Sequence, residues 1–220
     1  MVNLNLIKDS VVLVRVNYDL PLLGYTARIK DSISTIRTLL QNNNRLVLMT
    51  HWGRPKGKVV SDNSTQKIVS LLREQFQNSN NQFLVNTFIE YIYQYQIYRE
   101  ASEYIRNANT EQNSGFAAIL ENTRFHPMEK SKNPEDRLNL AKQYAILGDV
   151  FVDEAFAVSH RQEATNTEIK SILPHTLGHS YESEIHHLLK LKDTVKKPFC
   201  IIMAGSKLGT KLNLITQLIN

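Results

Sequence analysis

Short apolar blocks rich in β-branched residues recur along this chain, and they limit its possible folds more than any other feature. The first block, Val11 to Val16, reads VVLVRV, and similar blocks follow at Arg45–Thr50, Phe116–Leu120 and Asp149–Val152. Nearly continuous apolar blocks of this length are typical of strands buried on both faces of a parallel sheet. We therefore expect a sheet of such strands at the centre of the molecule.

Amphipathic segments lie between these blocks. Apolar residues recur at helical spacing from Ile29 to Leu40 and from Ile68 to Phe76. Asn133-Pro134 is a typical helix start, and the helical pattern that follows it ends at Gly148. Strands that alternate with helices in this way predict an α/β fold with a parallel sheet.

The remaining segments are less regular. Phe83–Val85 could form a short strand, and we predict a helix for the tyrosine-rich stretch after it, on the spacing of Ile89, Ile92, Ile97 and Ile105. We also predict a helix with Ile185, Leu188 and Leu189 on one face, a buried strand at Phe199–Met203 and a short helix at Lys211–Ile219. This gives an α/β domain over residues 1–180, a helix and linker over 181–197, and one strand–helix unit over 198–220.

Composition excludes several classes of protein. The 220 residues are 42% hydrophobic and 21% charged, close to the globular average, so the chain is neither wholly disordered nor collagen-like. No apolar run approaches the roughly 18 residues of a membrane-spanning helix. Lys8 and Asp9 interrupt the stretch where a secretion signal must be apolar. The single cysteine, Cys200, excludes an internal disulfide and a multi-cysteine metal site. We expect a cytoplasmic protein without a membrane partner, and we assign no metal ligand.

Charged and polar residues follow each predicted strand. In open parallel sheets, ligands bind beyond the carboxyl ends of the strands, so these positions are the candidate site. The net charge of +5 indicates an anionic partner. A lone arginine after a strand is usually a solvated surface residue, but four at successive strand ends would repel one another unless an anion bound between them. The candidate residues are Asn17, Asp19, Arg28, His51, Arg54, Arg124 and Arg161.

A different loop follows the last predicted strand. Ala204–Lys211 reads AGSKLGTK, a small-residue turn with two lysines, Lys207 and Lys211, one helical turn apart. Such a loop can bring backbone N–H groups and a lysine to a phosphate at a helix N-terminus, although its spacing is not that of a P-loop. An ordinary strand-to-helix turn explains these residues equally well.

Taken together, six segments resemble the phosphoglycerate kinase family in order and spacing. They are RVNYDLP (15–21), ARIKDSISTIRTLL (27–40), LMTHWGRPKGK (48–58), LENTRFHPMEK (120–130), DVFVDEAFAVSHR (149–161) and AGSKLGTK (204–211). The resemblance implies a three-layer α/β/α, Rossmann-like domain that binds the glycerate. It also implies the start of a second domain that binds the nucleotide.

The resemblance also implies an activity and a role for each candidate residue. The family transfers a phosphoryl group between 1,3-bisphosphoglycerate and ADP, with Mg²⁺, and gives 3-phosphoglycerate and ATP. By similarity, Arg28, Lys207 and Lys211 are expected to be catalytic, and Gly205, Lys207 and Lys211 to contact the nucleotide. The expected substrate-binding residues are Asn17, Asp19, Arg28, His51, Arg54, Arg124 and Arg161. We expect a monomer that does not bind nucleic acid.

The chain departs from the family pattern at several places. The family has Asp and then Asn where this chain has Asn17 and Asp19, and Ala157 replaces a glycine. Glu163 replaces a histidine and Thr210 an aspartate. Family members also continue for about as many residues again. We therefore expect a divergent fragment of such an enzyme, with little or no activity by itself.

Two other functions remain open. The chain could be a non-catalytic protein that binds phosphoglycerate or another anion at the arginine cluster and transfers nothing. The net positive charge could also bind nucleic acid. However, the arginines occur singly after strands, without the basic stripe and interleaved aromatic residues that are typical of single-strand binding.

Overall fold

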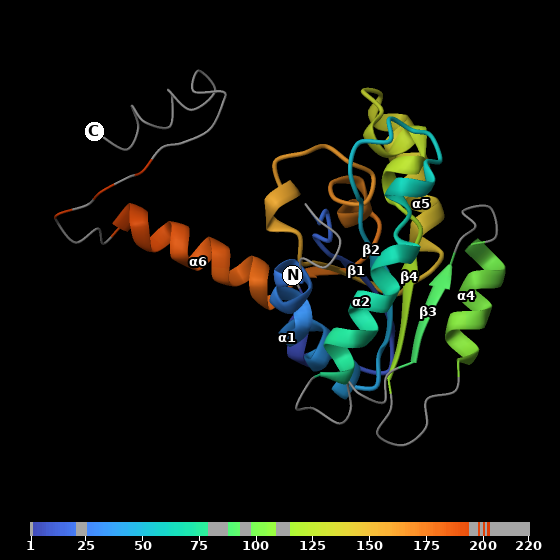
Figure 1. Cartoon of the computed structure of the whole chain (residues 1–220), viewed down its shortest axis with the longest axis horizontal. Coiled ribbons are helices and arrows are strands. Elements are labelled where there is room, and N and C mark those ends of the chain that lie inside the picture. Colours follow the sequence, from blue (N-terminus) through green and yellow to red (C-terminus); the bar gives the residue numbers. More distant parts are fainter. Residues whose placement is uncertain are drawn as a thin grey trace. The chain divides into compact units, whose positions relative to one another are not determined.

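A computed structural model describes residues 2–20, 26–78, 88–92, 98–108 and 115–193, together with Pro198, Cys200 and Ile202. Its centre is a six-stranded sheet in the order β3-β4-β2-β1-β5-β6, and every neighbouring pair of strands is parallel (Figure 1). The strands are β1 (Val11–Arg15), β2 (Arg45–Met49), β3 (Phe88–Ile92), β4 (Phe116–Leu120), β5 (Val150–Asp153) and β6 (His175–Leu177). The predicted parallel α/β sheet is confirmed.

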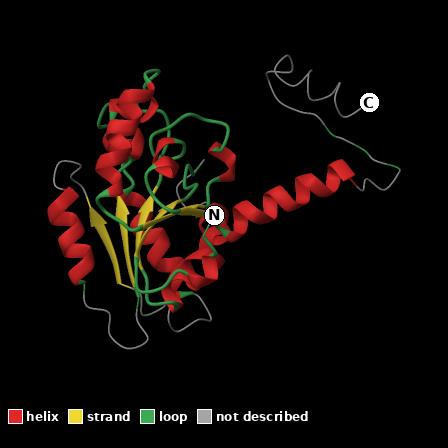
Figure 2. Ribbon diagram, turned by 180° about the vertical axis from the view of Figure 1, so that it is seen from behind, coloured by secondary structure: helices red, strands yellow, loops and turns green. Residues whose placement is uncertain are grey.

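Helices cover both faces of this sheet, as Figure 2 shows. Buried residues of α1 (Ala27–Gln41) and α2 (Gln66–Gln77) pack on one face, and those of α4 (Tyr98–Asn107) and α5 (Pro134–Ala145) on the other. Alternate residues of β1 join the two cores, because Val12 and Val14 belong to the first and Val11 and Leu13 to the second. The result is the predicted three-layer α/β/α arrangement. The other helices are α6 (His179–Asp193) and the 3₁₀ turns Leu4–Leu6, Ser61–Asn63, Thr123–Phe125, Pro127–Lys130, Phe156–Val158 and Glu168–Ser171.

Local sequence explains where these elements begin. All five residues of β1 and all five of β4 are buried, as expected for strands that are apolar except for Arg15 at the end of β1. Helix α5 begins at Pro134, and the side chain of Asn133 accepts a hydrogen bond from the Glu135 N–H, which caps the first turn.

Two strands were not expected from the sequence. The helix predicted for the tyrosine-rich stretch is wrong over Phe88–Ile92, which forms β3 and pairs with β4. Its FIEYI sequence has a helical spacing of isoleucines, but its aromatic and β-branched residues favour a strand once a neighbouring strand offers hydrogen bonds. The helical part is correct from Tyr98 onward as α4. Strand β6 was missed because it is three residues long.

Other predictions lie largely or wholly outside the described residues, namely the strands at 83–85 and 199–203 and the helix at 211–219. The chain divides into two compact units, Met1–Ile185 and His186–Asn220. The predicted boundaries at 180 and 197 stay predictions. No helix among the described residues is long and apolar enough to cross a membrane.

Candidate functional site

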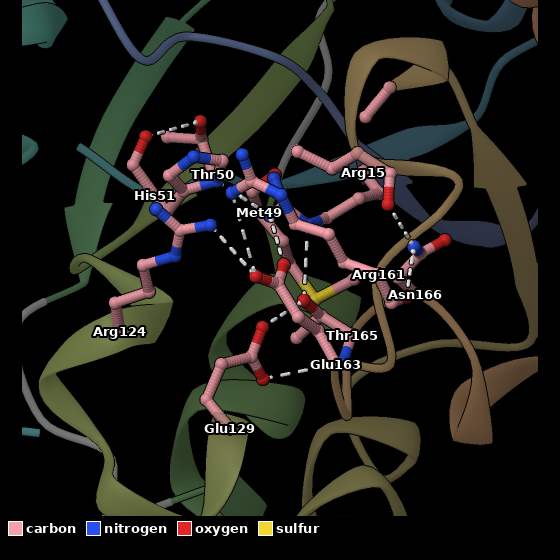
Figure 3. Close-up of polar contacts among 12 residues, drawn as sticks. Arg15, Met49, Thr50, His51, Arg124, Glu129, Arg161, Glu163, Thr165 and Asn166 are labelled. Atoms are coloured by element: carbon pink, nitrogen blue, oxygen red, sulfur yellow. Dashed lines mark hydrogen bonds and ion pairs between the residues drawn. The ribbon is translucent and has the colours of Figure 1, made fainter. Parts of the chain in front are cut away.

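The carboxyl ends of the central strands lie level with one another. Arg15, the last residue of β1, pairs with Met49 of β2 on one side and with Asp153 of β5 on the other. The loops after these strands therefore start at one edge of the sheet, where Figure 3 shows their polar side chains in contact.

Arg15 is the centre of this cluster and was missed as a site residue. Its guanidinium is fully buried, and it donates to Thr165 Oγ1 (3.0 Å), to the Val16 carbonyl (2.7 Å) and to His51 Nδ1 (2.8 Å). Its Nη2 also lies 3.4 Å from Glu163 Oε2. The sequence does hold a signal, since Arg15 is the one charged residue in the VVLVRV block. A charge buried in a strand must have partners from other segments.

His51 connects Arg15 with Asp19. Because Nδ1 accepts from Arg15, the ring proton is on Nε2, which lies 3.5 Å from Asp19 Oδ2. Burial, helped by the charges of Arg15 and Arg124, lowers the pKa of His51 to about 4, against the opposing effect of Asp19. His51 is therefore neutral at physiological pH.

Asp19 is held by the loop that follows β2. Its Oδ1 accepts a hydrogen bond from the Gly53 N–H at 2.8 Å, and the Gly53 carbonyl accepts one from Arg124 at 3.1 Å. Burial by itself would raise the pKa of Asp19, but the hydrogen bonds from His51 and Gly53 lower it to about 2. Gly53 thus connects the loop after β1 with the loop after β4.

Glu163 lies among the arginines and is fully buried. Its Oε1 is 2.8 Å from Arg124 Nη2 and 4.0 Å from Arg161 Nη1, while its Oε2 faces Arg15. Burial opposes ionisation, but the charges of Arg15 and Arg124 hold the pKa of Glu163 below its ordinary value. The carboxylate is therefore charged and pairs with these arginines.

Glu129 lies behind Thr165, on the inner side of the cluster. It is fully buried, and its Oε1 is 2.5 Å from Thr165 Oγ1, which accepts a hydrogen bond from Arg15. Burial, together with the charge of Glu163, raises the pKa of Glu129 to about 8. The two neighbouring carboxyl groups thus differ in charge near neutral pH, with Glu163 ionised and Glu129 protonated.

A small pocket of about 90 Å³ lies beside this cluster and contains Asn17 and Arg28. Arg28, in the first turn of α1, donates to the backbone carbonyl of Asp19. Ala157 and Glu154 also line the pocket. Burial raises the pKa of Glu154 to about 8.

A larger pocket of about 420 Å³ opens on the other side of Arg124. Arg54 is exposed and makes no hydrogen bond or ion pair with another residue in the described part of the chain. The buried Nε of Arg124 has no hydrogen-bond partner there either. The cationic or titratable residues that line the pocket are Arg54, Lys56, Arg124, His126 and Lys130.

The structure thus brings most of the predicted residues to one edge of the sheet. Asp19, His51, Arg124 and Arg161 are joined through Arg15, Glu163 and Gly53. Asn17 and Arg28 share the small pocket, and Arg54 lines the large one. Gly205, Lys207, Thr210 and Lys211 lie outside the described residues. Within the described ranges, no group of three His, Cys, Asp or Glu side chains could hold a metal ion.

These features define an open parallel α/β protein with a cationic site at the carboxyl ends of its strands. The family model of phosphoglycerate kinase matches residues 2–220, so the chain belongs to the phosphoglycerate kinase family. The resemblance seen in the sequence is confirmed.

Individual relatives agree with this assignment. The phosphoglycerate kinase of Bifidobacterium longum (strain DJO10A) is 34% identical over 218 residues, which are 97% of this chain and 51% of the relative. That of Fervidobacterium nodosum is 29% identical and matches 97% of this chain and 50% of its own length. The crystal structure of phosphoglycerate kinase from Pyrococcus horikoshii OT3 superposes with a TM-score of 0.79 at 28% identity, over 96% of this chain and 50% of that one. The chain therefore spans about half the length of the relatives it matches.

Proposed function

We propose that this chain provides the phosphoglycerate-binding half of a phosphoglycerate kinase. The reaction is the reversible transfer of a phosphoryl group between 1,3-bisphosphoglycerate and ADP, which gives 3-phosphoglycerate and ATP. The observation that carries the proposal is the convergence of four strand-end loops on one cationic edge that includes the exposed Arg54. Family membership supports the same function.

Each part of the glycerate has a matching group at this edge. Arg54 and Arg124 line the large pocket and would bind the phosphate, with Arg161 beside them. Asn17 and Asp19 would contact the hydroxyl and carboxylate. His51, neutral, would hold the Asp19 carboxylate in place. Arg28 would meet the phosphoryl group that is transferred, and its contact with the Asp19 carbonyl puts it beside the other two residues. Positioning and charge stabilisation of this kind supply most of the catalysis in phosphoryl transfer.

The nucleotide would be bound by the other part of such an enzyme. We propose that Gly205, Lys207 and Lys211 contact it and that Lys207 and Lys211 assist the transfer, as the family resemblance suggests. Mg²⁺ would enter with ATP or ADP and neutralise phosphate charge. We further propose that the protein acts in the cytoplasm as a monomer, and that these 220 residues by themselves transfer little or no phosphoryl group.

A second candidate function is phosphoglycerate binding without transfer. The observation in its favour is the pairing of the inner arginines with Glu163, which leaves less positive charge for a reacting phosphoryl group. A coupled assay with 3-phosphoglycerate and MgATP distinguishes the two functions, because turnover at enzyme-like rates requires the first.

Calorimetric titration of the chain with 3-phosphoglycerate tests the proposed binding. We expect Arg54→Ala to weaken binding by about tenfold or more, because a charge-assisted hydrogen bond contributes roughly 1.5–3 kcal/mol. Arg37→Ala is the matched control, since Arg37 is an exposed arginine on α1. Equal affinities for the two variants, or no binding by the folded chain, would contradict the proposed function.

A further inference from the structure

The carboxylate of Glu163 occupies the space between arginines in which an anionic ligand would be expected. One oxygen contacts Arg124 and the other faces Arg15, so each carboxylate oxygen is paired with an arginine. Figure 3 shows Glu163 among Arg15, Arg124 and Arg161, with the guanidinium groups turned toward it. None of the carboxylate is exposed to solvent.

The backbone holds Glu163 in this place. Its carbonyl accepts hydrogen bonds from the N–H groups of Asn166 (3.0 Å) and Thr167 (2.8 Å). The side chain of Asn166 in turn donates to the carbonyls of Val158 and Arg161, which ties the two ends of the loop together. A side chain that is buried and anchored in this way cannot swing out of the cluster when a ligand arrives, unless the loop itself opens.

The carboxylate of Glu163 compensates the positive charge of the buried arginines around it. Arg15 and Arg124 are both at least 95% buried, and buried guanidinium groups require negative charge nearby. Glu163 supplies one such charge, because the neighbouring Glu129 is protonated near neutral pH and His51 is neutral. An incoming phosphate must therefore approach arginines whose field is already partly cancelled.

We propose that Glu163 is a built-in counter-anion that determines the affinity of this site for phosphate. It closes the inner part of the cluster, between Arg15 and Arg124. A phosphate is thereby limited to the outer side, where Arg54 is exposed and has no partner among the described residues. This inference deepens the proposed function, and its statement about 3-phosphoglycerate rests on that function. Binding of inorganic phosphate tests the role of Glu163 as a counter-anion independently of it.

The test compares Glu163→Gln with the unmodified chain in titrations with inorganic phosphate and with 3-phosphoglycerate. Glutamine keeps the size and an acceptor oxygen while removing the charge. We expect both ligands to bind at least about tenfold more tightly. Inorganic phosphate should also raise the melting temperature of the variant more than that of the unmodified chain. Glu168→Gln is the matched control, because it removes a carboxylate paired at 2.6 Å with the buried Arg137, outside the cluster.

Loss of Glu163 could prevent folding, so a second variant is needed. Glu163→His, measured at about pH 8 where histidine is neutral, offers a ring of similar reach without negative charge. It should show the same gain in phosphate affinity. If neither variant folds even at high phosphate concentration, Glu163 serves folding alone and the proposal is wrong.

The outcomes separate this inference from the proposed function. Unchanged phosphate and 3-phosphoglycerate affinities in both folded Glu163 variants would overturn the counter-anion, while the effect of Arg54→Ala could still support the proposed function. A gain for inorganic phosphate without any preference for 3-phosphoglycerate would confirm the counter-anion and contradict the proposed function.

Discussion

At the scale of single residues, His51 is neutral mainly because it is buried, and the charges of Arg15 and Arg124 act in the same direction. Arg15 donates to one ring nitrogen and Asp19 lies beside the other, so the neutral ring fits both partners. The folded chain therefore takes up a proton at His51 only near pH 4, whereas an unfolded histidine does so near 6.5.

This difference predicts an acid loss of stability. A pKa lowered by folding contributes stability that is present above the unfolded pKa and is lost as the pH falls toward the folded pKa. Between pH 6.5 and about 4 we expect a loss of roughly 3 kcal/mol from this group, at about 1.4 kcal/mol per pH unit. Urea unfolding of the chain and of His51→Gln across this range measures it. Profiles that run parallel would show that His51 does not titrate in this way.

Glu129 predicts a pH dependence of the opposite sign. Its pKa rises from 4.5 to about 8 in the folded chain, so its contribution to stability is fully present below 4.5 and is lost as the pH rises to 8. Glu129→Gln imitates the protonated form. We expect this variant to gain stability relative to the unmodified chain with a slope of up to about 1.4 kcal/mol per pH unit over that interval. A constant difference at all pH values would contradict the assignment.

At the scale of elements, the loop after β2 depends on the backbone of Gly53. Its φ angle is +67°, and a Cβ built there would lie 2.3 Å from Asn63 Nδ2. The conformation is needed because the Gly53 N–H and carbonyl contact Asp19 and Arg124. We predict that Gly53→Ala lowers the free energy of unfolding by about 1–2 kcal/mol from the backbone alone.

Asn63→Ala in the Gly53→Ala background separates the two causes. Removal of the Asn63 side chain relieves the contact but leaves the strained φ angle, so part of the loss in urea unfolding should remain. Complete recovery would assign the effect to the contact with Asn63 and not to the backbone.

The elements differ in how far their sequences determine them. Blocks such as VVLVRV and FAAIL could be predicted as central strands, because burial on both faces makes them nearly continuously apolar. The segment FIEYI could not, because its isoleucines have helical spacing and its pairing with β4 depends on a distant part of the chain. The three residues of β6 are too few for any pattern.

At the scale of the whole molecule, topology makes part of the site predictable. Parallel strands whose ends are level bring the loops after them to one edge, so Asp19, His51, Arg54, Arg124 and Arg161 could be chosen by position alone. Arg15 could not be chosen with them, since its partner groups come from His51 in the loop after β2 and from the loop around Thr165. In the sequence, Glu163 is notable only because it replaces a histidine of the family pattern. Its contacts with Arg15 and Arg124 could not be predicted, because they depend on how the loop after β5 folds.

The central claim is that this edge of the sheet binds phosphoglycerate. An NMR titration of the ¹⁵N-labelled chain with 3-phosphoglycerate tests it most directly, because amide shifts report where a ligand binds. We predict shift changes in the strand-end loops, at residues 51–58, 122–126 and 155–163, and none at the opposite edge, around Asn44 and Gly148. Changes confined to the opposite edge, or no changes at saturating ligand in a folded chain, would contradict the claim.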